Sequence, residues 1–536
     1  MMRPRLPRRV PFSPAFLHFV LFVVLLFLTA CDRLSLPGAR HPGESTQSPS
    51  APARPSDTPM AKPGVTILTA SPLPIATPDL SGTLVHFWHP WSGELGRALT
   101  ALVEQFNLNN PWGVLVAARQ YPGYDALEAE LEQAAQATDR PQVAILFPHQ
   151  ALALDEASQL VDLRSYVNNP QWGFTSLELE SFYPLFAEQG AVDGRRLGVP
   201  VFYSAPLLYY NQTWAQELGF DRPPANPDEF LQQACTAASA NQRDDDRDND
   251  ATGGWIVTTD YAALLSWLYA FGGDALKSPE PGLSQSVYQF NTPQNEEALR
   301  FLRAAFENGC AWLPASQVPE DEFARRLGLF YIGTAMDIPH QQEAFNTLGS
   351  RDRWTVLPFP SAASRPVLEV YGPLYTLLTG SQEQQLAAWL FLRWLSSPDN
   401  QARLVQASGA LPVSEAALES LEAYAGRYPQ WAAALDFLRY ARVEPSYRSW
   451  GQVRWAMQDA ATQLFRPYFT IDQVPVLLSY LDSFAAELHL GPDLESVFAT
   501  VTDTPKPSST PTRTPTPSPS PTRTRTPAPP SPSPSP

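Results

Sequence analysis

The sequence predicts an α/β fold in which parallel strands are covered by helices, because β-type and helix-period patterns alternate where its ordered part begins. A short apolar strand is expected at 83–88, followed by helix-period apolar positions over 95–106. A second strand is expected at 114–119, a second helix at 124–137 and a third strand at 142–147. Strands joined through helices lie parallel, and their ligand crevices open at the carboxyl ends of the strands. We therefore expect a binding crevice where these strands end.

Aromatic and imidazole side chains follow the first and third of these strands. Trp88, His89 and Trp91 lie at the end of the first strand and in the loop after it, and Phe147 and His149 follow the third. Functional side chains concentrate in such loops. We expect these five residues at the crevice edge, with at least one of the first three touching a ligand. A solvated loop histidine is the alternative for His149.

The N-terminal segment has the features of an export signal. Arginines at positions 3, 5, 8 and 9 precede an apolar run over 16–28, which is short for a membrane span. The residues Leu28-Thr29-Ala30-Cys31 resemble a bacterial lipobox, in which lipid is attached to the cysteine thiol. We expect 1–31 to be a lipoprotein signal that leaves the protein anchored through Cys31 to the outer face of the cytoplasmic membrane. The alternative, an uncleaved anchor helix, also exports the body.

Two further segments lack the apolar periodicity of a folded core. Residues 32–81 are rich in Pro, Ser, Thr and Gly, and residues 499–536 alternate Pro with Ser, Thr and Arg. Such composition cannot bury enough surface to offset chain entropy. We expect a disordered tether before the body and a disordered tail after it.

Composition limits the function classes. The 536 residues are 44% hydrophobic, which suits a globular protein of two or three domains, and the net charge of -17 argues against a nucleic-acid partner. The motifs of serine hydrolases, zinc peptidases and phosphate-binding loops are missing. We therefore expect neither catalysis nor a cofactor. A glycoside hydrolase needs only two well-spaced carboxyl groups, so a surface-anchored carbohydrate-processing enzyme stays an alternative.

The remaining cysteines and an acidic run raise two structural questions. Cys235 and Cys310 are expected in the same lobe, and an exported protein can oxidise them to a disulfide. Asp244, Asp246 and Asp248 partly imitate a calcium loop, but the position of its closing glutamate is occupied by tryptophan. A solvated acidic loop is the favoured interpretation of this run.

Four segments, in order, carry a family resemblance. They are 194–211 with its continuation to about 228, Phe330 to Asp337, Leu357 to Pro360 with Tyr371-Gly372, and the run from Gln382 through Gly409-Ala410-Leu411-Pro412-Val413. Together they resemble the family 1 extracellular solute-binding proteins of ABC transporters, a group that includes the maltodextrin-binding proteins. The resemblance spans roughly 82 to 495. It rests on the order of these segments and not on the chemistry of a binding site, so it supports the function only by association.

The resemblance implies the two-lobed periplasmic-binding-protein fold, each lobe a mostly parallel sheet flanked by helices, with hinge segments between them. It implies a first lobe built from 82–203, a second lobe from 204–329, a return to the first lobe over 330–370, and a C-terminal helical part of the second lobe over 371–498. A carbohydrate bound between the lobes would favour the closed state that an ABC permease recognises. Nothing in the sequence argues for oligomers, so we expect a monomer.

Sugars need aromatic faces for their rings and polar groups for their hydroxyls. Beside the crevice residues above, the candidates for these contacts are Tyr203, Ser204, Trp255, Asp337, Tyr371 and Arg448. Core packing is an alternative for several of them, Tyr203 among them. Glycerol phosphate and polyamine are alternative ligands. The first would require a cluster of Arg or Lys in the cleft, and the second would require several carboxylates there.

Overall fold

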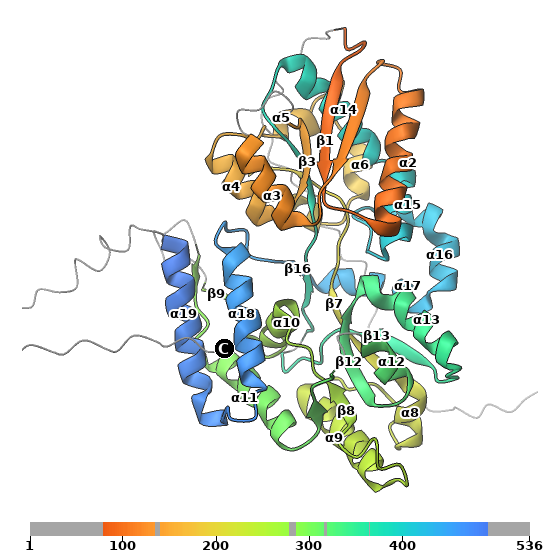
Figure 1. Ribbon diagram of the computed structural model, residues 1–536, viewed down its shortest axis with the longest axis vertical. Helices are drawn as coiled ribbons and strands as arrows, with labels where there is room; N and C mark the ends of the chain where they lie inside the picture. The colour runs from red at the N-terminus through yellow and green to blue at the C-terminus, as the bar shows by residue number, and fades with distance from the viewer. Residues whose placement is uncertain (1–78, 135–139, 278–285, 316–318, 364, 491–536) are drawn as a thin grey trace, which may run out of the picture. The chain divides into compact units, whose positions relative to one another are not determined.

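The computed structural model describes residues 79–134, 140–277, 286–315, 319–363 and 365–490, which all belong to one structural unit of the chain. Two five-stranded sheets, each with its own covering helices, dominate these residues (Figure 1). We call each sheet with the helices packed on it a lobe. The predicted signal segment with Cys31, nearly all of the tether and the tail lie outside the described residues.

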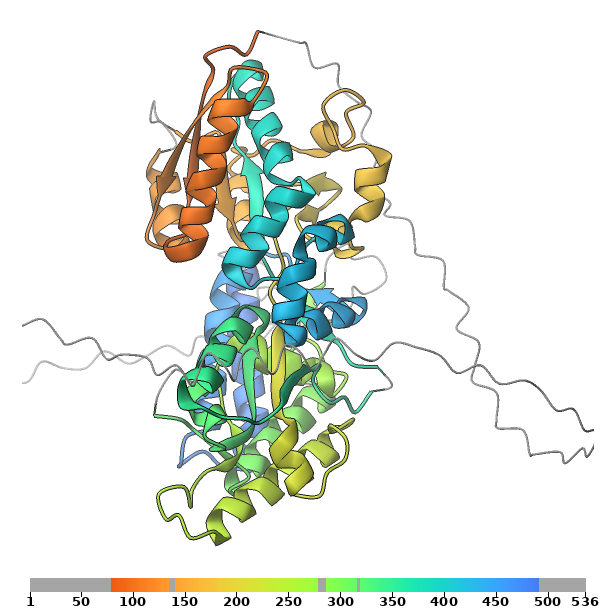
Figure 2. The ribbon, with the colours of Figure 1, turned by 90° about the vertical axis from the view of Figure 1, so that its right-hand side faces the viewer.

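The first lobe is built on the sheet order β2-β1-β3-β15-β6. Strand β1 (Leu84–His89) runs parallel to β2 (Leu115–Gln120) and to β3 (Val143–Leu146), while β15 (Leu374–Leu377) pairs antiparallel with β3 and with β6 (Val199–Pro200). Helices α2 (Gly93–Asn109) and α14 (Gln382–Leu395) cover one face, and α3 (Tyr124–Gln133) and α4 (Pro148–Glu156) cover the other. Figure 2 shows α2 beside the C-terminal helices of this lobe, where α15 (Pro398–Ser408) packs on it.

Alternation along β1 decides which of its side chains are core. Phe87 points to the α14 face, with its ring centroid 5.3 Å from that of Phe391. The next residue, Trp88, points to the opposite face and packs 4.9 Å from Tyr121. Because successive side chains of a strand alternate between faces, and helices cover both faces here, neither ring is left for solvent.

The second lobe is built on the sheet order β11-β8-β12-β7-β13. Strands β8 (Gly253–Ile256), β11 (Ala311–Trp312) and β12 (Gly328–Thr334) are parallel, and β7 (Pro206–Asn211) pairs antiparallel with β12 and with β13 (Trp354–Leu357). The helices packed around this sheet are α9 (Pro227–Arg243), α10 (Tyr261–Ala270), α11 (Pro293–Glu307), α13 (Ile338–Leu348), α18 (Trp450–Leu464) and α19 (Val474–Leu490).

Shorter elements complete the two lobes and their connections. They are α5 (Arg164–Val167), α6 (Ser176–Ser181), α7 (Leu185–Glu188), β4 (Ala191–Val192), β5 (Arg195–Arg196), α8 (Gln212–Glu217), β9 (Leu276–Lys277), β10 (Val287–Tyr288), α12 (Pro319–Ala324), η2 (Ala335–Asp337), β14 (Leu368–Val370), η3 (Glu415–Leu421), α16 (Glu422–Arg427), α17 (Pro429–Leu435), η4 (Asp436–Tyr440), β16 (Ala441–Val443) and η5 (Ile471–Gln473).

The chain path differs from the predicted one after residue 329. The predicted return of 330–370 to the first lobe is wrong, because β12 and β13 pair with β7 in the second sheet. Every residue of β7 is buried, so its backbone groups need a partner strand on each side, and these two strands supply them. The chain rejoins the first sheet only at β15. The predicted assignment of all of 371–498 to the second lobe is therefore also wrong.

Two crossings lie side by side where the lobes meet. The Ser204 amide donates to the Tyr371 carbonyl at 2.7 Å, and the Tyr371 amide donates to the Ser204 carbonyl at 3.0 Å. Tyr203 and Leu411 exchange a similar pair of bonds at 2.8 and 2.7 Å. These short bridges tie three strands of chain together at the hinge while leaving each lobe its own sheet.

The two remaining cysteines and the acidic loop are both resolved. Cys235 and Cys310 form a disulfide, as expected, and their Cα atoms are 4.3 Å apart. In the acidic loop, Asp244 accepts from the Asp246 amide and Asp246 from the Asp248 amide, so these carboxylates bind their own backbone. In the described part of the chain no three His, Cys, Asp or Glu side chains are placed to hold a metal ion.

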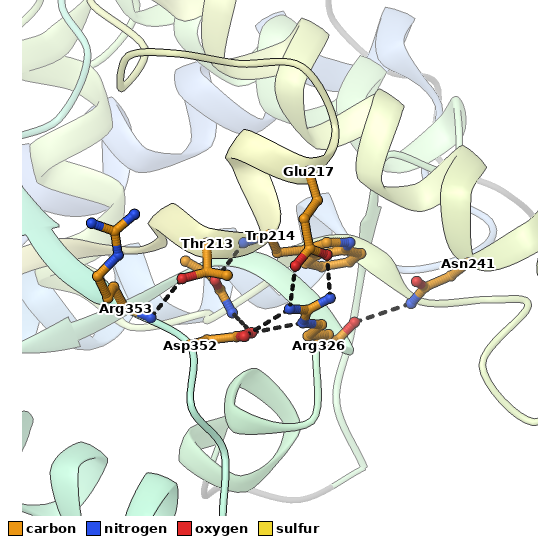
Figure 3. Close-up of polar contacts among 8 residues, drawn as sticks. Thr213, Trp214, Glu217, Asn241, Arg326, Asp352 and Arg353 are labelled. Carbon is orange, nitrogen blue, oxygen red and sulfur yellow. Dashed lines mark hydrogen bonds and ion pairs between the residues drawn. The ribbon is translucent and has the colours of Figure 1, made fainter.

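Arg326 joins three segments of the second lobe (Figure 3). Its guanidinium lies 2.6 Å from Glu217 and 2.7 Å from Asp352, and its carbonyl accepts from the Asn241 amide group at 3.1 Å. Asn211 also donates to Asp352, at 2.8 Å. Burial raises the pKa of Asp352, but these hydrogen bonds outweigh it and hold the pKa below its ordinary value. The network fastens α8 and the end of β7 to the start of β12.

Replacing Arg326 with Met is expected to lower the free energy of unfolding by about 2 kcal/mol, because Asp352 keeps its charge but loses its main partner. Urea denaturation followed by fluorescence measures the change. Arg325→Met is the matched control, since that arginine is 3.8 Å from Asp321 and both side chains are more than half exposed. We expect the control to lose less than about 0.5 kcal/mol. Equal losses in the two variants would contradict the prediction.

No helix within the described ranges is both long enough and apolar enough to cross a bilayer.

Candidate functional site

A cavity of about 490 Å³ opens where the parallel strands of the second sheet end. The segments after β8, β11 and β12 form its walls, as expected for a sheet of this kind. Its lining residues are Pro206, Val257, Thr258, Thr259, Asp260, Ala263, Leu313, Pro314, Pro319, Glu320, Tyr331, Ile332, Gly333, Thr334, Asp337 and Gln458. We call it the Asp337 cavity.

Three carboxylates face the Asp337 cavity. Asp260 caps α10 and accepts from the Ala262 amide at 2.8 Å, and Asp337 accepts from the amide of Thr334 at 2.7 Å. Desolvation raises the pKa of Asp260 and of Glu320, and the charge of Asp337 raises both further, although the Asp260 side chain still reaches solvent. Among the described lining residues there is no Lys, Arg or His. The cavity therefore offers hydroxyl, amide and carboxylate groups without a resident cation.

Helix α18 contacts an aromatic group of the first lobe and also lines the Asp337 cavity. The Tyr124 and Phe147 ring centroids are 4.3 Å apart, and the Trp91 indole donates to the Tyr124 hydroxyl at 3.0 Å. Arg454 of α18 lies 5.5 Å from the Phe147 ring centroid. One turn further along α18, Gln458 lines the Asp337 cavity. The helix thus connects the first-lobe aromatic group to the second-lobe cavity.

Of the residues expected to contact ligand, Asp337 lies in this cavity and Trp88 and Trp255 do not. Trp88 is 2% exposed and Trp255 is 1% exposed. Trp255 packs among Phe230, Trp267 and Phe465 in the second-lobe core. Both tryptophans lie on strands rather than in the loops after them, so they are core residues.

The two expected histidines are buried and held in their neutral form. Burial lowers the pKa of His89 to about 4, and its Nδ1 accepts from the Trp91 amide at 3.3 Å. Burial, assisted by the charge of Arg454, lowers the pKa of His149 to about 3. A Cβ on Gly451 would lie 2.8 Å from the His149 ring, so this imidazole packs directly against the first turn of α18.

The other expected residues are spread over the hinge and the first lobe. Tyr203 is buried, and Ser204 and Tyr371 form the hinge bridge described above. Arg448 pairs with Glu156 at 3.1 Å and lines a separate pocket between α3 and α4. Trp91 stacks on Phe202 at 5.5 Å and, with His89, borders a groove beside α2.

Two buried glutamates, Glu369 and Glu444, contact α10, the helix that Asp260 caps. Glu369 of β14 and Glu444 after β16 come together because these strands pair in parallel, with Glu369 opposite Arg442. Tyr261 donates to Glu444 at 2.9 Å and Ser266 donates to Glu369 at 3.2 Å. Burial, and the charge of Glu444, raise the pKa of Glu369 well above its ordinary value, and burial also raises that of Glu444.

Sequence reasoning missed Asp260, Glu320, Arg454 and Gln458. Asp260 had a usable signal, since Thr258-Thr259-Asp260 follows a short strand and precedes a helix-period run, the same pattern that singled out Trp91 and Phe147. Arg454 and Gln458 had none, because only the packing of a distant helix brings them to the cavity.

Comparison with known proteins gives a consistent result. The model of the bacterial extracellular solute-binding protein family matches residues 101–432. The sn-glycerol-3-phosphate-binding periplasmic protein UgpB of Escherichia coli strain K12 is 22% identical over 365 residues, which are 63% of this chain and 76% of that protein.

Two solved structures share the fold. The sugar-binding protein MalE of Xanthomonas citri matches with a TM-score of 0.63 and 19% identity, over 78% of this chain and 99% of that one. UgpB of Mycobacterium tuberculosis, solved with glycerophosphocholine, matches with a TM-score of 0.61 and 20% identity, over 77% of this chain and all (100%) of that one.

These matches confirm the two-lobed periplasmic-binding-protein fold and a binding protein rather than an enzyme. They also confirm export, since the matched family is extracellular. The chain belongs to the bacterial extracellular solute-binding protein family.

Proposed function

We propose that this protein is the lipid-anchored solute receptor of an ABC importer, and that it holds a carbohydrate or related polyol in the Asp337 cavity for delivery to a membrane permease. The observation that carries the proposal is the lining of that cavity. Threonine hydroxyls, the Gln458 amide and carboxylates are the groups that bind sugar hydroxyls, and the cavity's volume of about 490 Å³ lies in the usual range for small-molecule sites.

The lining argues against a phosphate ester as the main ligand. A phosphate group needs Arg, Lys or backbone amides, and arginine is the usual bidentate partner. In the described lining the charged residues are Asp260, Glu320 and Asp337, which would repel it. Arg454 is near Phe147, but it does not line the cavity. The ligands named for the UgpB relatives are thus poor candidates for this chain.

Closure is the second part of the proposal. Tyr124 and Phe147 of the first lobe are packed together beside Arg454, so a ligand in the Asp337 cavity could take a ring face from one lobe and polar groups from the other. A ligand that touches both lobes binds the closed state better and shifts the population toward it. The protein is expected to work as a monomer.

Lipid attachment at Cys31 completes the proposal. Lipid on the lipobox cysteine would hold the receptor beside its permease, with 32–81 as the tether. Palmitate labelling of whole cells is expected to mark the protein, and the label is expected to disappear in Cys31→Ser. Labelling that survives this substitution would contradict the assignment.

Asp337→Asn tests the site. The substitution keeps the shape but removes the charge, and it is expected to weaken binding of the cognate sugar by roughly 10- to 100-fold, since a charged hydrogen bond contributes about 1.5–3 kcal/mol. A thermal-shift screen of sugars first finds the ligand, because saturation at a hundred times Kd adds about 2.7 kcal/mol to the native state. Titration calorimetry then compares the variants.

Asp459→Asn is the matched control for that titration. Asp459 is exposed on α18, next to Gln458 but outside the cavity lining. We expect wild-type affinity from it. A sugar that binds Asp337→Asn as tightly as the wild type would place the site elsewhere.

A further inference from the structure

The proposed function leaves the ligand's charge open, and the Asp337 cavity has an unbalanced charge. Resting on that function, we propose that the ligand is an amino sugar, a polyhydroxylated ring carrying a protonated amine, with the ammonium group held among Asp260, Glu320 and Asp337. Threonine hydroxyls and Gln458 would take the hydroxyls of the same molecule.

Each of the three carboxylates has an oxygen to offer. Within the described part of the chain, the hydrogen bonds that Asp260 accepts all go to its Oδ1, and those that Asp337 accepts all go to its Oδ2. The Oε2 atom of Glu320 is buried and has no hydrogen-bond partner there. Capping therefore uses one oxygen of each aspartate and leaves the second for a donor with several N–H groups.

Beside the carboxylates, Tyr331 forms part of the cavity wall. Its side chain is 1% exposed, and its hydroxyl interacts with the hydroxyl of the neighbouring Tyr209. The Tyr209 hydroxyl in turn donates to the Thr334 carbonyl at 2.7 Å.

Gly333 keeps the wall between these groups open. A Cβ at this position would lie 2.9 Å from the Tyr209 ring, 3.0 Å from the Tyr331 ring and 3.4 Å from Oδ2 of Asp337. Any side chain here would crowd the rings and cover the Asp337 carboxylate. The absence of one leaves the carboxylate and the Tyr331 ring on the same wall of the cavity.

The protein's own cations do not balance this charge. Arg454 acts electrostatically on Asp260, and His340 acts on Glu320, but neither lines the cavity. Arg454 is also shared with Glu444 behind the site and lies over the Phe147 and Tyr261 rings. Closure around a neutral sugar would desolvate three carboxylates without a counter-charge, whereas an ammonium group supplies one.

A metal ion is a weaker occupant than an amine. In the described residues the carboxylates of this cavity are not placed as a group of three ligands around one point. An amino sugar does not require all three to converge, because its ammonium group can pair with one or two of the carboxylates while its ring hydroxyls donate to the rest of the wall.

The test uses sugars that differ in one substituent. Calorimetry at pH 6.5 compares glucosamine and galactosamine, and the β-1,4-linked di- and trisaccharides of glucosamine, each with its N-acetylated and its plain hydroxyl counterpart. The N-acetyl form keeps the nitrogen and loses the charge. We expect at least one free amine to bind ten-fold or more tighter than both counterparts. We also expect its affinity to fall above about pH 8, where sugar amines, like an α-amino group, lose their proton.

Asp260→Asn links the preference to the cavity. We expect it to weaken the amine by ten-fold or more and the hydroxyl counterpart by less than three-fold, while Asp459→Asn changes neither. An unchanged melting temperature without ligand shows that the variant is folded. Equal binding of neutral and amine forms by the wild type would overturn this inference and leave the proposed function standing. Binding of spermidine or of a phosphate ester, with no sugar of any kind bound, would overturn both.

Discussion

Removing the Cys235–Cys310 disulfide is expected to lower the free energy of unfolding of the second lobe by about 4.5 kcal/mol, the value the chain-entropy relation gives for the 75-residue separation of its cysteines. The bond is well placed to have this effect. It joins α9 to the residue before β11, an edge strand whose other contacts to the sheet run through β8. Without it, α9 would be held to the β11 edge by packing alone, and β11 would keep only its pairing with β8.

Calorimetry of wild type and of the Cys235→Ala, Cys310→Ala double variant measures the loss. Reduced wild type is the matched control. Reduction should bring the melting temperature of the wild type close to that of the double variant. The same reductant should leave the melting temperature of the double variant unchanged. Insensitivity of the wild type to reductant would contradict this expectation.

The fold class and the disulfide could be predicted from the sequence because both follow from local signals. Strand and helix periods in the first 65 or so residues of the body indicate parallel strands, and the export signal indicates an oxidising compartment. The return of the chain could not be predicted this way. Gly328–Thr334 reads as a buried strand in either lobe, and its assignment depends on pairing with Pro206–Asn211, more than a hundred residues away.

The candidate site could also be predicted only in part from the sequence. Position after a strand was the reason for predicting both Phe147, which lies beside Arg454, and Asp337, which lines the cavity. The same rule failed for Trp88, because it counted the last residues of the strand as loop. An aromatic residue in a doubly covered strand is core, and only the second covering layer of helices, α3 and α4, reveals that for Trp88.

Replacing Glu369 with Gln is expected to stabilise the protein at neutral and alkaline pH. Burial and the neighbouring Glu444 raise the pKa of Glu369 well above its ordinary value, so the native state binds a proton that the unfolded chain releases. This contribution to stability is complete below the unfolded pKa of about 4.3 and is lost as pH rises toward the folded pKa. Gln keeps an acceptor for Ser266 and carries no charge, so it avoids that loss.

Urea unfolding between pH 5 and pH 9 measures the difference. Each unit of pKa shift corresponds to about 1.4 kcal/mol, so the variant should exceed the wild type by at least that amount at pH 8, and the difference should shrink to about 1 kcal/mol or less at pH 5. Glu419→Gln, an exposed change of the same type, is expected to follow the wild type throughout. Wild-type stability that rises steadily from pH 5 to pH 8, with no gain in Glu369→Gln, would mean that the pair is charged. The charge of Arg454 on Glu444 would then outweigh burial at this hinge.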